Sequence, residues 1–264
     1  MKAFSLLVLL LATTAASAVC GLRAPTVSLS APVTALLEDL ALLGHPQLKA
    51  ISMFHAVQSP TSVPRLGGGL FLSQKTLAQF AGHTIFFDES GELQRRLGAR
   101  PELTTISVRT RSLDPFEVTF QALEQLHAQL VGCEAEVAAL REKYLAERTW
   151  LVAQKPFSRR MYFFLGEVTT SKWPELLMVA DGPVLFWTRH GKLRTFASEL
   201  AYVRWGEKWK KSLAPSDLLV GLAESKAPFA VEKTAHWNAR GPGVLTPGPG
   251  QIRFMRQFVE AVAR

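Results

Sequence analysis

The sequence has few cysteines and lacks the common catalytic motifs. Only Cys20 and Cys133 occur among 264 residues, and a metal site cannot rest on two such cysteines alone. There is no Gly-x-Ser-x-Gly segment, no phosphate-binding Gly-x-x-x-x-Gly-Lys segment and no His-Glu-x-x-His segment. The sequence therefore lacks the signatures of serine hydrolases, P-loop nucleotide-binding proteins and zinc proteases, and we expect a protein that is not an enzyme.

Long apolar runs are missing except at the N-terminus. The apolar segment from Phe4 to Ala12 follows Lys2 and precedes Ala16-Ser17-Ala18, an arrangement typical of a secretory signal peptide. This segment is too short to span a bilayer, and no later stretch reaches the roughly 18 apolar residues that a transmembrane helix needs. We predict a signal peptide at residues 1–18 and export of the remaining chain to the periplasm.

The two cysteines leave several alternatives open. A lipid anchor on Cys20 is the less favoured one, because Ser17-Ala18-Val19 lacks the Leu and the small residue of a good lipobox. A disulfide between Cys20 and Cys133 would suit an oxidising compartment. Cys133 would serve equally well as a small buried apolar residue.

Positive charge exceeds negative charge, but it is not concentrated. The formal net charge is +8, without a Lys/Arg block or an alternation of basic and aromatic residues. A basic protein can bind nucleic acid, membranes or anionic ligands. Because these charges are dispersed, we interpret them as a solvated surface and expect no nucleic-acid partner.

A long amphipathic segment lies in the middle of the chain. Asp114-Pro115-Phe116-Glu117 has the residue types of a helix start, with Asp as the N-cap and Pro at the first helical position. Apolar residues then recur at helical spacing as far as Tyr144. We predict a single interdomain helix over residues 114–148.

Two halves with a similar order of elements flank this helix. In the first half, short apolar segments typical of buried strands alternate with amphipathic helical segments. The strands are expected at 26–30, 49–53, 83–87 and 104–108. Because strands that alternate with helices form parallel sheets, we predict an α/β fold with two lobes that contain parallel-type sheets. The N-terminal lobe would cover 19–113 and the C-terminal lobe 149–264.

The second half follows the pattern less regularly. Its strands are expected at 161–165 and 217–222, with an edge strand at 234–237. Helices are expected at 175–180, 199–211 and 251–263. The halves share an order of elements but no repeated sequence, which favours two lobes over a repeat array.

This layout resembles the periplasmic solute-binding proteins whose two lobes are joined by one backbone helix, such as the cobalamin-, siderophore- and haem-binding components of ABC importers. The segments that carry the resemblance are Ser28-Leu29-Ser30 and the helix after it, 77–87, the long helix, 161–165, Trp205 and Glu207 ahead of 213–220, and Thr246-Pro247-Gly248-Pro249. It covers nearly the whole exported chain. It implies the bilobal binding-protein fold, a small ligand held between the lobes with slight closure, and presentation to an ABC permease in the inner membrane. We expect a monomer.

The resemblance places the ligand on loops at the carboxyl ends of the strands, as is general for open α/β sheets. Aromatic side chains there would suit a large flat ligand. The expected ligand-binding residues of the first lobe are Ser30, Pro32, Phe54, His55, Phe71 and Asp88, and those of the second lobe are Glu167, Trp187, Tyr202, Trp205 and Trp237. Core packing is the alternative role for any single aromatic among them.

The ligand itself is expected to be cobalamin, haem or a ferric siderophore, and no resident cofactor or metal is predicted. His55 is a nitrogen donor that could bind haem or a metal, or else be an ordinary loop histidine. For permease docking, the resemblance points to Lys75 and Glu207, and members that dock carry an acidic residue on each lobe. Lys75 reverses that charge. It implies a permease with altered charges, or a periplasmic interaction or sensory module that does not transport.

Overall fold

The computed structural model describes residues 19–53, 55, 57, 59–67, 72–89, 91–98, 100–110, 114–154, 161–164, 176–180, 200–204, 218–221, 235–238 and 248–261. Within these residues the first sheet has five strands in the order β4-β3-β2-β5-β6, and every neighbouring pair is parallel. The strands are β2 (Thr26–Leu29), β3 (Leu48–Ser52), β4 (Arg65–Leu66), β5 (Thr84–Asp88) and β6 (Thr104–Val108). The parallel sheet expected for the first lobe is confirmed.

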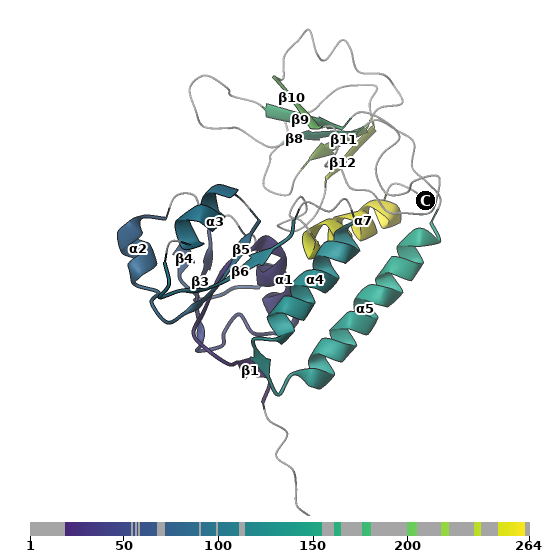
Figure 1. Ribbon diagram of the computed structural model, residues 1–264. Coiled ribbons are helices and arrows are strands. Elements are labelled where there is room, and N and C mark those ends of the chain that lie inside the picture. Colours follow the sequence, from purple (N-terminus) through teal and green to yellow (C-terminus); the bar gives the residue numbers. More distant parts are fainter. Residues whose placement is uncertain are drawn as a thin grey trace, which may run out of the picture.

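Helices cover both faces of this sheet because its strands are apolar on both faces. Ile85 and Phe87 of β5 pack in one cluster with Leu77 of α2 (Gln74–Ala78) and Leu97 of α3 (Gly91–Gly98). Phe86, between them in the sequence, packs in the other cluster, with α1 (Ala31–Asp39). Alternate residues of one buried strand therefore join the sheet to two helical layers (Figure 1).

The single helix predicted over 114–148 is wrong. The segment forms α4 (Pro115–His127), a short strand β7 (Leu130–Val131) and α5 (Glu134–Val152), and α4 and α5 lie side by side (Figure 1). Gly132, with φ of 64°, lies in the turn between the helices. Both helices contribute apolar residues to one core cluster, which explains the continuous apolar pattern of the sequence. The predicted helix start is confirmed, because the Asp114 carboxylate accepts a 2.8 Å hydrogen bond from Phe116 N.

A disulfide fastens the start of the described chain to this turn. Cys20 is bonded to Cys133, and next to it β1 (Gly21–Leu22) pairs with β7. Of the alternatives left open by the sequence, the structure therefore selects the disulfide. A sulfur that is bonded to another cysteine cannot also carry a lipid.

The second sheet, in the described part of the chain, has the order β10-β9-β8-β11-β12. Its strands are β8 (Met161–Phe164), β9 (Leu176–Ala180), β10 (Leu200–Arg204), β11 (Leu218–Gly221) and β12 (Ala235–Asn238). The β8, β11 and β12 strands are parallel, as expected, but β9 and β10 are antiparallel to their neighbours. The sheet is therefore mixed.

Two helices predicted in the second half are also wrong. Residues 176–180 and 200–204, which were expected to be helical, form β9 and β10. Short apolar segments such as Leu176–Ala180 fit a buried strand as well as a buried helix, so periodicity does not separate the two. The predicted strand at 217–222 and the edge strand at 234–237 are confirmed as β11 and β12.

The last described helix, α7 (Pro249–Ala261), returns to the first lobe. It contacts α1 and α4, and its Ile252, Phe254 and Met255 belong to the same core cluster as residues of the first sheet. The helix predicted at 251–263 is thus present, but it packs with the N-terminal lobe although its residues were assigned to the C-terminal one. The chain consequently crosses from the first lobe to the second after α5 and returns to the first lobe before α7 (Figure 1).

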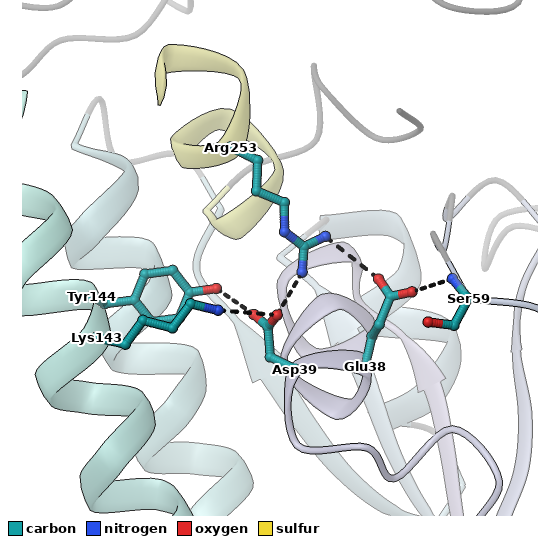
Figure 2. A network of polar contacts seen from close by, with 6 residues as sticks. All are labelled: Glu38, Asp39, Ser59, Lys143, Tyr144 and Arg253. Atoms are coloured by element: carbon teal, nitrogen blue, oxygen red, sulfur yellow. Dashed lines mark hydrogen bonds and ion pairs between the residues drawn. The ribbon is translucent and has the colours of Figure 1, made fainter. Parts of the chain in front are cut away.

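A polar network fixes α7 to α1 and α5 (Figure 2). The Arg253 guanidinium binds the carboxylates of Asp39, at 2.9 Å, and Glu38, at 3.4 Å. Tyr144 of α5 donates a 2.5 Å hydrogen bond to the other oxygen of Asp39. Burial raises the pKa of the Tyr144 phenol well above its usual value, and the Asp39 charge adds to this, so the phenol stays a donor.

A second contact of the same kind lies further along α7. The Arg256 guanidinium lies 4.0 Å from the centre of the Trp150 ring and 2.9 Å from the Glu147 carboxylate. Arg253 thus holds α7 against α1, and Arg256 holds it against the last turns of α5. None of the helices described is long and apolar enough to cross a membrane.

Candidate functional site

The candidate site lies at the carboxyl edge of the first sheet. The strand that follows β2 in the sequence, β3, lies on one side of β2 in the sheet. The next strands, β5 and then β6, lie on its other side. This is the point where the strand order reverses, and ligands of open α/β sheets bind at such points. Ser30 follows β2 and Asp88 ends β5, so two predicted site residues meet there.

Asp88 is held close to the first turn of α1. Its Oδ2 accepts a 3.4 Å hydrogen bond from Ala31 N, a contact that suits the positive end of a helix. Its Oδ1 is buried and has no hydrogen-bonding partner among the described residues, and the same is true of Ser30 Oγ. Burial raises the pKa of the Asp88 carboxyl to about 6, against the smaller opposite effects of the Ser30 hydroxyl and Ala31 N–H nearby.

His55 lies after β3 at the same edge, and its side chain is anchored from α1. Thr34 Oγ1 is 3.0 Å from His55 Nδ1 and 2.9 Å from the Ser30 carbonyl oxygen, to which it donates. Ser28 Oγ lies 2.8 Å from the same hydroxyl. Burial lowers the pKa of His55 to about 4, and the nearby Arg65 charge contributes, so the imidazole is neutral at neutral pH.

An exposed methionine adjoins this histidine. Met53, directly after β3, is 56% exposed, although large apolar side chains of the first lobe are mostly buried. Arg65 of β4 donates a 3.1 Å hydrogen bond to the His55 carbonyl and so fixes the segment that carries both residues. The edge therefore combines an apolar surface, an imidazole and two buried polar atoms that have no partner in the part of the chain that the structure describes.

The remaining predicted residues of the first lobe are placed differently. Pro32 is buried, and Gly248 packs close to it, so it lies among the helices rather than at an open edge. Lys75 is exposed on α2, which covers the face of the sheet opposite α1. Phe54 and Phe71 lie outside the described residues.

In the second lobe the described residues fix only backbone positions. Tyr202 lies in β10 and Trp237 in β12, at opposite edges of the second sheet, about 19 Å apart at the usual strand spacing. Tyr202 was expected in a helix and instead lies within a strand. Glu167, Trp187, Trp205 and Glu207 lie outside the described residues.

Thr34 and Met53 were not predicted as site residues. Thr34 is a buried polar residue in an otherwise apolar helix start, Ala31-Pro32-Val33-Thr34-Ala35-Leu36-Leu37. A single polar position on such a buried face must find a partner inside the protein, and this was the available signal. For Met53 the signal was its position directly after a strand of the parallel sheet.

The rest of the described chain contains no better candidate for a ligand site. No group of three or more His, Cys, Asp or Glu side chains there is arranged to hold a metal ion. A hollow of about 530 Å³ between α4 and α5 is lined by charges of both signs. Several of these charges are already engaged, as Arg148 binds Asp114 at 3.4 Å and Arg141 stacks over Phe120.

Comparison with known proteins identifies the fold. No protein-family model matches the sequence, and no curated protein matches it significantly. The structure is similar to the periplasmic heme-binding protein RhuT of Roseiflexus sp. RS-1, with a TM-score of 0.58 and 16% identity over 90% of this chain and 99% of that chain. It is also similar to the periplasmic heme-binding protein HutB of Vibrio cholerae, with a TM-score of 0.62 and 13% identity over 92% and 100% of the two chains.

The periplasmic vitamin B12 binding protein BtuF of Vibrio cholerae has the same fold, with a TM-score of 0.55 and 14% identity over 89% of this chain and 95% of that one. These structures match nearly the full length of the chain, so both lobes are included in the likeness. The predicted fold class, the bilobal α/β fold of periplasmic binding proteins, is confirmed. Its internal geometry differs from the prediction in the hairpin of α4 and α5 and in the mixed second sheet.

Proposed function

We propose that this chain is the exported solute-binding component of an ABC importer, and that it captures haem, cobalamin or an iron–siderophore chelate between its lobes. The observation that carries the proposal is the carboxyl edge of the first sheet. Ser30 Oγ and Asp88 Oδ1 are buried there and have no hydrogen-bonding partner among the described residues, at the point where ligands of such sheets bind. Buried polar atoms without partners are costly, and a ligand that bonds to them removes that cost.

The fold and the disulfide support the same proposal. Solved proteins of this fold include ones that are named for binding heme and vitamin B12. A disulfide such as Cys20–Cys133 persists in oxidising compartments, as the periplasm is. We propose a monomer that binds ligand without catalysis and then docks on an inner-membrane permease through both lobes.

A second function is favoured by one observation, the exposed Lys75 on α2. If this position meets the permease, its partner must carry negative charge there, because like charges across an interface cost several kcal/mol. The alternative is a periplasmic interaction or sensory module that has kept the fold without transport.

Thermal unfolding of residues 19–264 with a panel of ligands separates the two functions. The panel contains haem, cobalamin, ferric siderophores, Zn²⁺ and Mn²⁺. A ligand that binds only the folded state adds about 2.7 kcal/mol at 100 times its Kd, so the midpoint should rise by several degrees. No shift with any of them would overturn solute capture and favour a protein partner, to be sought by pull-down.

A further inference from the structure

The loop between β3 and β4 is held to α1 at two points one helical turn apart. We call it the site loop, because it carries Met53 and His55 at the candidate site, and the structure describes its residues 53, 55, 57 and 59–64. Thr34 Oγ1 of α1 lies 3.0 Å from His55 Nδ1. Four residues further along the same face of α1, Glu38 Oε1 accepts a 2.7 Å hydrogen bond from Ser59 N. The second anchor of the site loop therefore depends on one carboxylate.

The same carboxylate is bound from the last described helix. The side chain of Glu38 is only 8% exposed, so its charge is poorly solvated and needs a partner of opposite sign. Its Oε2 accepts a 3.4 Å hydrogen bond from the guanidinium of Arg253 in α7 (Figure 2). One side chain of α1 thus joins the site loop to a helical residue that is 215 positions away from it in the sequence.

Arg253 is itself fixed on its other side. Its Nη2 donates a 2.9 Å hydrogen bond to Asp39 Oδ1, while Asp39 Oδ2 accepts one from the Tyr144 hydroxyl of α5. Lys143 Nζ, also of α5, lies 3.5 Å from Asp39 Oδ1. Arginine suits this place because its planar guanidinium offers separate nitrogens to the two carboxylates. A change in the position of α7 is therefore transmitted to Glu38 through one rigid group.

The two helices that meet α1 in this network adjoin the connections between the lobes. The chain leaves the first lobe after α5 and re-enters it at α7. Such connecting segments absorb the change when two domains close around a ligand. The network thus leads from both connections to the loop that carries His55 (Figure 2).

We propose that Arg253 and Glu38 are positioning residues for the candidate site, which couple the placement of α7 to the geometry of the site loop. The consequence for ligand binding rests on the proposed function. In this role neither residue touches the ligand, because both act through the backbone of Ser59. The coupling is reciprocal, so ligand bound at the site loop and α7 docked on α1 favour each other.

Hydrogen exchange at the Ser59 amide, measured by NMR on residues 19–264 without ligand, tests the coupling. Arg253→Gln should speed this exchange about tenfold, because Glu38 without its counter-charge turns toward water and gives up a charge-assisted hydrogen bond. Arg256→Gln is the matched control, since Arg256 binds the same helix to Glu147 and Trp150 of α5 instead of to α1. It should leave exchange at Ser59 unchanged.

Two further variants keep the test independent of folding defects. Arg253→Lys retains the charge but lacks the separate nitrogens, so it should fold and still speed exchange at Ser59 several-fold. Glu38→Ala removes the acceptor of the Ser59 amide altogether. Adding Arg253→Gln to Glu38→Ala should change exchange at Ser59 no further, because Arg253 acts there only through Glu38. Additive effects of the two substitutions would overturn the proposal.

Ligand titration separates this coupling from solute capture. Haemin, cyanocobalamin and ferrioxamine B are titrated into the wild type, Arg253→Lys and Arg256→Gln. A probe that binds the wild type should bind Arg253→Lys about 3- to 30-fold more weakly and Arg256→Gln equally well.

Each other outcome is decisive. Unchanged exchange at Ser59 in both Arg253 variants overturns the coupling, and so does an equal change in Arg256→Gln. If a probe binds the wild type and Arg253→Lys equally well, the positioning role fails while solute capture stands. If no probe binds the wild type but exchange at Ser59 responds as expected, solute capture fails while the coupling of α7 to the site loop stands.

Discussion

At the scale of single residues, Asp88 has two roles that oppose each other. One carboxylate oxygen accepts a hydrogen bond from Ala31 N at the start of α1, while the other is buried without a partner among the described residues. A carboxylate in such a position is poorly solvated, which is why its pKa is raised to about 6. Ionised Asp88 therefore lowers the stability of the folded protein, and it also provides a hydrogen-bond acceptor at the candidate site.

The first prediction concerns the pH dependence that this causes. Between its ordinary pKa of 3.8 and about 6, folded Asp88 keeps a proton that the unfolded chain has released, so stability falls as pH rises through this interval. Asp88→Asn, which keeps an oxygen for Ala31 N, should remove the loss and be more stable than the wild type at pH 8, by up to about 3 kcal/mol. Urea unfolding at pH 4, 6 and 8 measures the difference. A gain that is equal at all three values would contradict the explanation.

The sequence predicted candidate site residues that follow strands, because position after a strand is a local property. Ser30, His55 and Asp88 were found in this way, and the structure gathers them at one edge of the sheet. Thr34 was missed because its role depends on an imidazole 21 positions away, a distance that no local pattern reports. Whether these residues bind ligand stays a prediction.

At the scale of elements, the start of α7 depends on a glycine. Gly248 has φ of 73°, in the left-handed region, and a Cβ there would lie 3.2 Å from side-chain atoms of Val118 and Thr119 and 3.3 Å from Pro32. Both the backbone conformation and the close approach of α1 and α4 therefore require a residue without a side chain.

The second prediction separates these two requirements. Gly248→Ala should destabilise the protein by about 2 to 4 kcal/mol, the sum of backbone strain and a tight contact with α4. Gly82→Ala is the matched control, since Gly82 has a similar φ of 77° but no atom within 4 Å of its added Cβ, and should cost only about 1 to 2 kcal/mol. Chemical denaturation of both variants gives the comparison. Equal losses would mean that packing against α4 contributes nothing.

Prediction of the elements failed where a local pattern had two solutions. The apolar face from Phe116 to Tyr144 fits one long helix as well as two helices that fold back onto the same core, and Gly132 was the signal for the second solution. The strands β9 and β10 were taken for helices because they are short and their apolar residues have no decisive period. Four strands of the first sheet were predicted correctly because they alternate regularly with helices, whereas the two-residue strand β4 was missed.

At the scale of the whole molecule, the disulfide joins parts of the chain that are far apart in sequence. Cys20 and Cys133 are separated by 113 residues, so the bond encloses almost the entire first lobe. A crosslink over so long a loop restricts the unfolded chain strongly.

The third prediction follows from that restriction. The double variant Cys20→Ala/Cys133→Ala should lose about 2 to 5 kcal/mol of unfolding free energy. Guanidinium denaturation measures it, and the wild type in a reducing agent should unfold like the variant. The variant itself should not respond to the reducing agent. A wild type that is equally stable in both conditions would show that the bond does not constrain the unfolded chain.

The return of α7 also has a consequence for the order of events when the chain is made. Ile252, Phe254 and Met255 are synthesised after every strand of both sheets, yet they complete a core that begins with β2 and α1. The first lobe therefore cannot finish folding while the polypeptide is still emerging, although it is the first part to appear. Under the proposed export, in which the chain would cross a membrane unfolded, this delay would keep the leading half from folding prematurely and make the docking of the last helix the final step of folding.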